Sequence, residues 1–574
     1  MSFPPICDNL FILRLFIMDQ KIQATMEEYF LRLWAQRDKI KTWDDLGKKK
    51  RALSAEFALP MVKNSDLLKV YKDLVLAGTI EADAAFIGIL KKRQIRTLSG
   101  VAPIAVLTRF QTCPGNCLFC PTEKAMPKSY LSNEPAVMRA IKTEFDPFLQ
   151  VRARIFALTN NGHEANKIEL IVMGGSWSAH PVDYQEWFLK RCFDAANAGL
   201  GEDKESASLA EAQKINENTD FRIVGLTLET RPDLIDEAET QRMRSYGCTR
   251  VEIGVQHLSD EILSLNKRGH GSAETIRATR LMKEAGLKVT YHLMPNLYGS
   301  TPEQDLQMFK DLFSNPNYQP DQIKIYPTVV TEGSELYDLW KAGQYQPYAD
   351  DVLKELLLKI KLSLPRYIRV IRLIRDIPAE SIQAGNKMSN LREILQTELK
   401  KRGQQCLCIR CREAKDQLFD LDNVHLYQEE YEASNGQEKF LWLGSADKNT
   451  LYAFLRLRFN NDFSPCHSGA SPDVHRGEEP GTSQIKSLSN YLPELKEAAL
   501  IREVHTYGKL IPPKQAGSKS FQHFGLGKTL MAEAERLAKV AGYKKIAVIS
   551  GIGVREYYRK LGYILEGTYM VKEI

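Results

Sequence analysis

The spacing of apolar residues changes twice along the chain. Residues 19–100 carry apolar positions at helical spacing, as in MEEYFLRLWAQ, and predict a helical region. Short β-branched runs then alternate with amphipathic segments such as Ser272–Ala285, which predicts strands at 102–107, 168–173, 223–228, 250–255, 287–293 and 322–326. Six or seven such repeats favour right-handed crossovers and a parallel sheet. We expect an open or partial (β/α) barrel, with its chemistry at the carboxyl ends of the strands.

Beyond about residue 410 the pattern becomes that of a compact α+β domain. Apolar runs predict antiparallel strands, and after them a helix, a strand, a helix and a last strand; the ranges are 440–443, 451–459, 500–507, 527–540, 545–549, 554–561 and 564–571. Two polar stretches, 201–219 and 464–484, are predicted to be insertions or loops. The predicted fold class is therefore α/β, a partial barrel followed by an α+β domain, with a helical basic N-terminal region.

Composition narrows the class of protein. The chain has 574 residues, of which 43% are hydrophobic and 26% charged, and a net charge of +6, so a mostly disordered chain is excluded. This small basic excess permits a nucleic-acid partner without requiring one. Residues 9–18 are apolar but short and contain Arg14, so neither a membrane span nor a signal peptide is predicted, and we expect a cytoplasmic protein. Six of the ten cysteines fall in two tight groups, which indicates metal ligation.

The first cysteine group, TCPGNCLFCP, holds Cys113, Cys117 and Cys120 just after the first predicted barrel strand. Three thiolates at this spacing can bind three irons of a [4Fe–4S] cluster and leave the fourth iron open. The open iron can chelate S-adenosylmethionine (SAM), which an electron from the cluster cleaves to a 5′-deoxyadenosyl radical. A structural zinc needs four protein ligands, and no fourth Cys or His lies within this loop. Zinc with a remote fourth ligand is the alternative.

Glycines and polar residues stand at the ends of the next predicted strands. Gly174 and Gly175 in MGGSW would let the backbone approach the methionine part of SAM. Glu229 and Arg231 in LETRPD would reach its ribose or carboxylate, and Gln256 ends the following strand. Each residue alone is typical of a turn or an ion-paired loop. Together, at consecutive strand ends, they predict a cofactor site.

A phosphate-binding loop is predicted in the C-terminal domain. The segment QHFGLGK, residues 522–528, opens a helix whose first N–H groups can hold a pyrophosphate. Q-x-x-G-x-G in this position is typical of acyl-CoA binding in GNAT acetyltransferases. Tyr557 and Tyr558 on the next predicted helix could contact the thioester or only pack that helix. His505 on the preceding strand could be a base, although a core position is more usual.

The second cysteine group, QQCLCIRCRE, holds Cys406, Cys408 and Cys411 between the two predicted domains. C-x-C-x2-C spacing suits a tetrahedral zinc that takes one more ligand from elsewhere, as a structural clip. His425, His467, His475 and several acidic residues are all candidates for that ligand. Unligated thiols are the alternative.

These features together resemble the family of the Elongator catalytic subunit, which carboxymethylates the wobble uridine of tRNA and includes single-chain bacterial and archaeal forms. The resemblance covers about residues 90–574. It rests on SNEPAVMRAIKTEFDPFLQ, IELIVMGGSW, TLETRPD, KIYPTVVTEGSELYDLWKAGQY, IRDIPAESIQAGNKMSNLRE, CLCIRCRE, FQHFGLGKTLMAEAERLA and AVISGIGVREYYRKLGY. The chain departs from the family in its short C-x3-C gap, which many eukaryotic members lengthen, and in the stretch 464–484.

The resemblance implies roles for regions and residues. It divides the chain into an extension (1–20), a basic tRNA-binding helical region (21–100), a radical SAM barrel (101–395), a zinc-binding linker (396–415) and a GNAT domain (416–574). Cys113, Cys117 and Cys120 would bind the cluster, and Lys167 would contact acetyl-CoA from the barrel side. Lys167, Tyr557 and Tyr558 are the candidate catalytic residues. Acetyl-CoA would also contact Glu503, Val504, His505, Thr506, Gln522, Gly525, Leu526, Gly527, Lys528 and Tyr558.

The implied reaction uses both the predicted barrel and the predicted GNAT domain. Acetyl-CoA would lose a methyl hydrogen to the deoxyadenosyl radical, the carbon radical would add to C5 of uridine 34, and thioester hydrolysis would leave a carboxymethyl group. The anticodon stem-loop suits this attack because its bases can turn out of the stack, and the basic N-terminal region would contact phosphates. The alternatives are a protein lysine acetyltransferase with a structural cluster, and a tRNA-binding scaffold. The sequence leaves open whether the chain forms a homodimer or needs accessory subunits.

Overall fold

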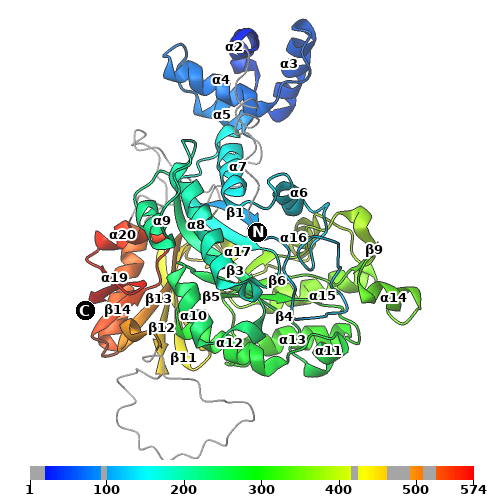
Figure 1. Ribbon diagram of the computed structural model, residues 1–574, viewed down its shortest axis with the longest axis vertical. Helices are drawn as coiled ribbons and strands as arrows, with labels where there is room; N and C mark the ends of the chain where they lie inside the picture. Colours follow the sequence, from blue (N-terminus) through cyan, green and yellow to red (C-terminus); the bar gives the residue numbers. More distant parts are fainter. Residues whose placement is uncertain (1–19, 92–99, 415–423, 462–490, 508–524) are drawn as a thin grey trace, which may run out of the picture. The chain divides into compact units, whose positions relative to one another are not determined.

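The structure, a computed structural model, describes residues 20–91, 100–414, 424–461, 491–507 and 525–574. The expected extension up to residue 19, the stretch 464–484 and Gln522 lie outside the described residues. The chain divides into two units, a smaller one of residues 1–97 and 155–165 and a larger one of residues 98–154 and 166–574 (Figure 1).

The smaller unit is helical, as its apolar spacing predicts. Its helices are α2 (Gln20–Trp34), α3 (Trp43–Glu56), α4 (Asn64–Leu76) and α5 (Ala84–Leu90). Met26, Tyr29, Phe30 and Leu33 fall three or four positions apart on α2 and are buried in one core with residues of the other three helices. Thr42 begins α3 with a capping box to Asp45.

The larger unit contains a seven-stranded sheet in which every strand is parallel to its neighbours. The strand order follows the chain and leaves β1 and β8 as the edges, so the sheet is a partial barrel. This confirms the predicted fold class and all six predicted strands, and it adds β8. The strands are β1 (Ala102–Leu107), β2 (Lys167–Met173), β3 (Arg222–Thr230), β4 (Arg250–Gln256), β5 (Lys288–Leu293), β6 (Gln322–Ile325) and β8 (Arg369–Arg372).

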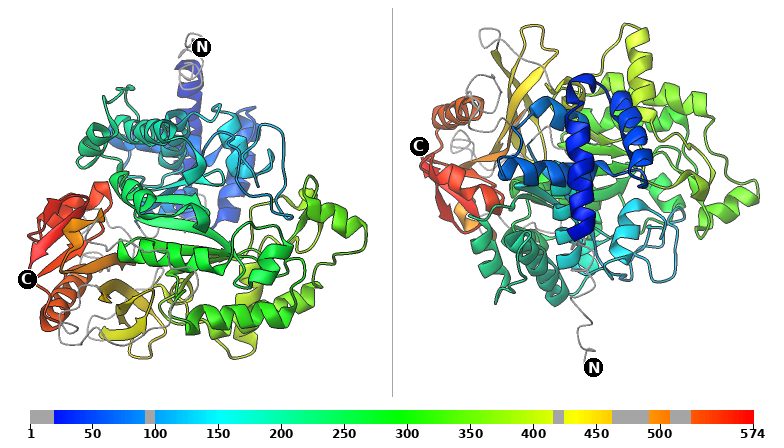
Figure 2. Two further views of the ribbon diagram at one scale, coloured as in Figure 1. Left: turned by 60° about the horizontal axis from the view of Figure 1, so that its bottom comes forward. Right: turned by 90° about the horizontal axis from the view of Figure 1, so that it is seen from above.

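Helices lie between the strands along the chain, and two more follow β8 (Figures 1 and 2). They are α6 (Pro135–Ile141), α7 (Pro147–Asn160), α8 (Val182–Ala198), α9 (Leu209–Asn216), α10 (Glu237–Ser245), α11 (Asp260–Leu265), α12 (Ser272–Glu284), α13 (Pro302–Ser314), α14 (Glu335–Lys341), α15 (Asp350–Ser363), α16 (Leu391–Lys401) and α17 (Ile409–Arg412). A small sheet pairs β7 (Val330–Thr331) with β9 (Ile382–Ala384).

A second seven-stranded sheet forms the C-terminal part of the larger unit. Its neighbours are antiparallel except β13 and β14, which are parallel. Helix α19 packs on this sheet over an apolar core. The elements are β10 (His425–Glu432), β11 (Gly436–Gly444), β12 (Leu451–Asn460), β13 (Ala498–Thr506), α19 (Leu526–Val540), β14 (Lys545–Val548), α20 (Arg555–Arg559), β15 (Ile564–Glu566) and β16 (Tyr569–Glu573).

The prediction of elements differs from the structure in three places. The single last strand over 564–571 is an antiparallel hairpin of β15 and β16, because Gly567 turns the chain with a φ of 53°. The stretch 201–219 is not only a loop, since Ser208 caps α9 within it. Strand β10 was not predicted, because most of its side chains are exposed or half-buried and it lacks an apolar run.

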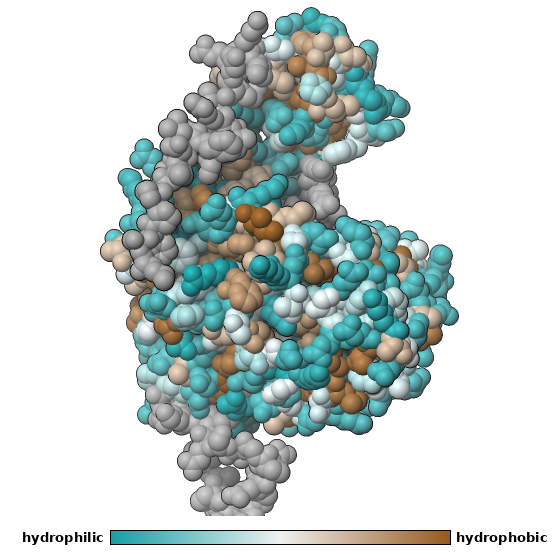
Figure 3. Space-filling model, turned by 45° about the vertical axis from the view of Figure 1, so that its right-hand side comes forward, coloured by the Kyte–Doolittle hydropathy of each residue, from teal (hydrophilic) through white to brown (hydrophobic). Residues whose placement is uncertain are grey.

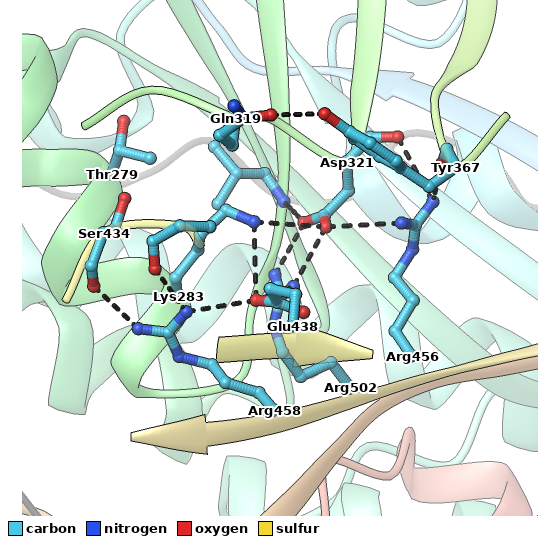
Figure 4. Close-up of polar contacts among 12 residues, drawn as sticks. Thr279, Lys283, Gln319, Asp321, Tyr367, Ser434, Glu438, Arg456, Arg458 and Arg502 are labelled. Atoms are coloured by element: carbon cyan, nitrogen blue, oxygen red, sulfur yellow. Dashed lines mark hydrogen bonds and ion pairs between the residues drawn. The ribbon is translucent and has the colours of Figure 1, made fainter. Parts of the chain in front are cut away.

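The two sheets are joined by buried charges (Figure 4). Asp321, just before β6, accepts hydrogen bonds from Arg502 on β13 at 2.9 and 2.6 Å. Glu438 on β11 accepts from Arg502 at 2.8 Å and from Arg458 at 3.1 Å. Lys283 lies 3.4 Å from Asp321 and 3.5 Å from Glu438. Removing one partner of such a set leaves an uncompensated buried charge, so the network holds the two sheets in a fixed arrangement.

A second contact brings the C-terminal part onto the barrel sheet. A turn, η11 (Ile552–Val554), packs against β3, and a Cβ on Gly551 would collide with the carbonyl oxygen of Val224. Glu217, near α9, accepts hydrogen bonds from Arg555 at 3.0 Å and from Arg559 at 2.7 Å. The predicted second domain is thus packed tightly on the predicted barrel within one unit.

No helix among the described residues is long and apolar enough to cross a membrane. On the face drawn in Figure 3, the apolar residues lie in small groups among hydrophilic ones.

Candidate active site

The loop that carries the first cysteine group begins after β1. Cys117 is buried and packs with Phe119, Ile262 and Leu336 in a small apolar cluster, while Cys113 and Cys120 are half-buried. The backbone N–H of Leu118 donates to the carbonyl of Asn266 at 3.2 Å, and that of Leu336 donates to the carbonyl of Leu118 at 2.9 Å. The loop is therefore held in place from both sides by later segments of the barrel.

The electrostatic surroundings of Cys117 favour a thiolate. Arg268 donates a hydrogen bond from Nη1 to the Cys117 Sγ at 3.3 Å. A hydrogen bond with Cys120 and, to a smaller extent, the Arg268 cation lower the pKa of Cys117 to about 5, against the opposing effect of burial. Thiolates are the form in which cysteines bind metal.

The three sulfurs of this loop are not packed as those of a single-ion site. Within the described residues, the only group of at least three His, Cys, Asp or Glu ligands whose atoms all lie within 4.8 Å of one another is Cys406, Cys408 and Cys411. Cys113, Cys117 and Cys120 are more widely spaced. At least one of the distances among these three sulfurs therefore exceeds 4.8 Å, so the trio as placed does not match three ligands of one tetrahedral ion.

The strand-end residues lie where the sequence places them. Gly174 and Gly175 follow β2 with φ values of 129° and 97°. Arg231 follows β3, pairs with Asp233 at 2.9 Å, and comes so close to Gly115 of the cysteine loop that a Cβ there would collide with its guanidinium. Gln256 ends β4 with a φ of 70°, and its buried Oε1 has no partner in the described residues. These groups border one end of the sheet beside the cysteines.

Glu229 has a different place, on the inner face of the partial barrel. Tyr130 donates a hydrogen bond to Glu229 at 2.8 Å, and His292 Nδ1 lies 3.4 Å from its other oxygen. The opposite nitrogen of His292 lies 3.0 Å from Glu252, which also binds Lys324. Glu229 is therefore part of a chain of polar side chains from β3, β4, β5 and β6.

The pKa shifts show that two of these polar side chains, Glu252 and Lys324, are charged. Burial acts to raise the pKa of Glu252, but the Lys324 cation and the His292 hydrogen bond hold it well below its usual range. Burial acts to lower the pKa of Lys324, but the Glu252 carboxylate raises it above its ordinary value. The barrel interior thus contains a fixed ammonium–carboxylate pair next to an imidazole.

Sequence reasoning missed Glu252, His292 and Lys324. The sequence did contain a signal for them. Residues two apart on one strand share a face, and alternate positions of β4, β5 and β6 are polar although these strands are buried. Such a strand has a polar inner face, as a barrel needs when its interior binds a ligand. The interior polar positions are Arg250, Glu252, Lys288, Thr290, His292, Gln322 and Lys324.

The predicted acyl-CoA residues gather at one edge of the C-terminal sheet. Glu503 to Thr506 end β13, and Gly525, with a φ of 76°, is the N-cap of α19, whose first turn holds Leu526, Gly527 and Lys528. A Cβ on Gly527 would lie 3.3 Å from the Tyr557 hydroxyl and 3.8 Å from Thr506. The end of β13, the start of α19 and Tyr557 therefore lie next to one another.

The two tyrosines of this site are placed differently from each other. Tyr558 is 7% exposed and packs in the apolar core with Tyr563, whereas Tyr557 is 39% exposed. The structure thus places the hydroxyl of Tyr557, and not that of Tyr558, next to the start of α19. Lys167 is the first residue of β2, at the end of the sheet opposite to the cysteine loop.

His505 and Glu503 are both engaged by neighbours. Burial and the Arg369 cation lower the pKa of His505 to about 4, and its ring stacks on Phe454. Glu503 accepts a hydrogen bond from Arg456 at 3.0 Å and lies 3.8 Å from Lys288 on the barrel strand β5. The acyl-CoA edge is therefore connected to the barrel by an ion pair.

The second cysteine group lies between the sheets. Ile409 donates its N–H to the carbonyl of Ile368 before β8, and Ala414 donates to that of Leu451 on β12, both at 2.9 Å. The ligand atoms of the three cysteines lie within 4.8 Å of one another, a spacing that suits one tetrahedral ion. His425 on β10 is exposed and is not part of this group, and His467 and His475 lie outside the described residues.

Known proteins share these features. Residues 107–312 match the radical SAM superfamily and residues 320–401 match the radical SAM C-terminal domain. The chain is 45% identical to the tRNA uridine(34) acetyltransferase of Methanocaldococcus infernus, over 89% of this chain and 91% of that protein. It is 38% identical to human Elongator complex protein 3, over 84% of this chain and 86% of that protein.

A solved structure agrees with this similarity. The archaeal Elp3 of Methanocaldococcus infernus with an N-terminal deletion superimposes with a TM-score of 0.68 at 42% identity, over 83% of this chain and 99% of that chain. The partial barrel, the second sheet and the sequence matches agree over most of the chain. It follows that this chain belongs to the family of tRNA uridine(34) acetyltransferases and Elongator complex protein 3, within the radical SAM superfamily.

Proposed function

We propose that the chain carboxymethylates C5 of the wobble uridine of tRNA, with acetyl-CoA as carbon donor and radical SAM chemistry as the source of the reacting radical. The names of its relatives support the substrate and the acyl donor. The observation that carries the proposal is the arrangement within one unit: the cysteine loop at one end of the barrel, a polar interior, and the acyl-CoA edge joined to the barrel through Glu503 and Lys288.

Cys113, Cys117 and Cys120, in the loop after β1, would hold the cluster. When bound there, the cluster and SAM would supply the radical chemistry by which the acetyl group is activated. Gly174, Gly175, Arg231 and Gln256 border this end of the sheet. There the buried Gln256 Oε1 and an unpartnered nitrogen of Arg231 offer polar contacts to a bound nucleoside.

Acetyl-CoA would be held at the C-terminal sheet by β13 from Glu503 to Thr506, by the segment 525–528 and by Tyr557. The N-terminus of α19 presents N–H groups and partial positive charge to the pyrophosphate. Of the two predicted tyrosines, Tyr557 and Tyr558, Tyr557 has the hydroxyl that faces Gly527. Lys167 would contact acetyl-CoA from the barrel.

The uracil would be bound in the barrel interior. The Lys324 ammonium, held by Glu252 beside His292, can donate to a uracil carbonyl oxygen. A buried interior also excludes water while a carbon radical exists.

The helical unit would bind the tRNA backbone. Of the basic run at 48–51, Lys48 and Arg51 are exposed, whereas Lys50 is buried and donates to Asn64 at 2.6 Å. Exposed lysine and arginine side chains neutralise phosphates without reading bases. We assign Cys406, Cys408 and Cys411 to a structural zinc.

The rival activity, lysine acetylation without radical chemistry, needs a general base, and the two candidates in this site are poor bases. Glu503 is buried in ion pairs with Arg456 and Lys288, and burial lowers the pKa of His505 to about 4. Neither group is suited to take a proton from a lysine ammonium at neutral pH.

The test uses the full chain, reconstituted with iron and sulfide and reduced without oxygen, then mixed with SAM, acetyl-CoA and tRNA. We expect 5′-deoxyadenosine and carboxymethyluridine. Cys117→Ala should abolish both products, whereas Cys192→Ala, at a buried free cysteine on α8, should retain them. Acetyl-lysine as the only product, unaffected by Cys117→Ala, would show that the rival is correct.

A further inference from the structure

Arg268 is a buried cation to which the described residues give no carboxylate. It is 5% exposed, and no Asp or Glu of the described part of the chain lies within 4.0 Å of its guanidinium. Its Nη2 donates to the carbonyl oxygen of Gly254 on β4, and its Nε is buried with no hydrogen-bond partner in the described part of the chain. A buried guanidinium normally requires an anion, because transfer of a cation out of water is costly.

The remaining nitrogen identifies the anion. Nη1 of Arg268 lies 3.3 Å from Sγ of Cys117, at hydrogen-bonding distance. The backbone supports this placement: the Arg268 N–H donates to the carbonyl of Leu263 at 2.9 Å, and the Arg268 carbonyl accepts from Arg231 Nη2 at 2.9 Å. The position of the guanidinium is thus fixed by contacts on several sides and is aimed at a cysteine that we assign to the cluster.

Arg231, the other arginine near the cysteine loop, differs from Arg268 in how its charge is paired. Arg231 also approaches the cysteine loop, at Gly115, but its charge is paired with Asp233 at 2.9 Å. Lys267, next to Arg268 in sequence, is exposed and pairs with Glu335. Of these three cations, Arg268 alone has no carboxylate within ion-pair distance in the described residues.

We propose that Arg268 is a positioning residue that donates a hydrogen bond to the Cys117 ligand sulfur and thereby raises the reduction potential of the cluster. This inference rests on the proposed function, since it requires that the loop binds a cluster. Reduction adds one negative charge to the cluster, and a buried cation with an N–H···S hydrogen bond stabilises the reduced form more than the oxidised form. The chain would in this way ease the electron transfer that SAM cleavage requires.

The space for this contact is made by Gly254. A Cβ on Gly254 would lie 2.7 Å from Nη2 of Arg268 and 2.9 Å from the side-chain nitrogen of Gln256. Any larger residue must therefore displace the guanidinium. Gly254→Ala would move the donor without removing its charge.

The experiment is a redox titration of the cluster, followed by electron paramagnetic resonance, in the full reconstituted chain without SAM. We expect Arg268→Met to make the cluster at least tenfold harder to reduce, which is a fall of about 59 mV for a one-electron couple. Arg268→Lys, which keeps the charge, should recover part of the loss, and Gly254→Ala should show a smaller fall. Lys267→Met is the matched control, because it removes an adjacent but exposed charge and should leave the potential unchanged.

The outcomes separate this inference from the proposed function. A wild-type chain that binds no iron and sulfide contradicts the proposed function itself. A wild-type cluster whose potential equals that of Arg268→Met contradicts the inference alone. A difference that appears only after SAM is added would assign Arg268 to SAM and overturn the inference. If Arg268→Met holds no cluster, Arg268→Lys and Gly254→Ala carry the test, and unchanged potentials in both would overturn it.

Discussion

The two cysteine trios of this chain place the same side chain in two different settings. Cys406, Cys408 and Cys411 bring their ligand atoms within 4.8 Å of one another, in a segment that bonds to the barrel on one side and to β12 on the other. The first trio is more widely spaced and lies at the carboxyl end of β1 beside two buried arginines.

The difference shows that cysteine spacing must be interpreted together with position in the fold. A compact trio in a linker suits one tetrahedral ion and a structural role, because it connects two sheets. A trio at the strand ends of a partial barrel suits a cluster with an open iron, because that edge is where such barrels bind their ligands. The predictions below test this division, from the largest effect to the smallest.

The largest effect is expected for the first trio. Cys113→Ala should abolish 5′-deoxyadenosine formation completely, because two thiolates cannot hold the cube with its open iron in place. The thermal unfolding midpoint of the metal-free protein should stay close to that of the wild type, since Cys113 is half-buried and does not belong to the apolar core. Product analysis and calorimetry of the same sample check both parts. A large drop in the midpoint would give this loop a structural role.

For the second trio we expect the opposite, a large loss of stability with SAM cleavage retained. Cys408→Ala should remove the bound metal and lower the free energy of unfolding by about 4 kcal/mol, in the range of a lost metal site. SAM cleavage per bound cluster should persist in the folded fraction. Metal analysis and urea unfolding measure this. A stable variant that has lost its metal and all SAM cleavage would reverse the proposed division between the trios.

Much of the framework was predictable from the sequence, because strands show short apolar, β-branched runs or alternating apolar positions and helices repeat their apolar positions every three to four residues. The six predicted barrel strands, the antiparallel strands of the second sheet and α19 follow from this rule. The turn at Gly567 and the polar strand β10 did not, since one is a backbone conformation and the other lacks an apolar run.

The interior of the candidate site was harder to predict. Glu252, His292 and Lys324 stand up to 72 positions apart in sequence and become neighbours only through the pairing of β4, β5 and β6. The choice between Tyr557 and Tyr558 depends on the phase of a five-residue helix, which the sequence does not set. Arg268 belongs to no recognised motif, and only its contact with Cys117 makes it informative.

The interface between the sheets offers a third test. If the second trio stabilises the chain by joining the two sheets, damage elsewhere in that interface should reproduce the stability loss without loss of metal. Glu438→Gln should lower the free energy of unfolding by about 3 kcal/mol, because Arg502, Arg458 and Lys283 lose a shared buried anion. Urea unfolding with metal analysis measures both. Glu430→Gln, on the exposed part of β10, is the control. Metal loss in Glu438→Gln would mean that the trio depends on the interface and does not act independently.

The smallest effect concerns the charge balance of the same interface. Burial lowers the pKa of Lys283 from 10.5 to about 8. Between these values the unfolded chain binds more protons than the folded chain, so this group makes the free energy of unfolding rise with pH, by at most about 1.4 kcal/mol per pH unit. Urea unfolding between pH 8 and 10 should show this slope in the wild type and in Lys310→Met, at an exposed lysine, but not in Lys283→Met. Equal slopes in all three would mean that Lys283 stays protonated between Asp321 and Glu438. The interface would then be held by a permanent cation, and its stability would be as insensitive to alkaline pH as that of an arginine pair.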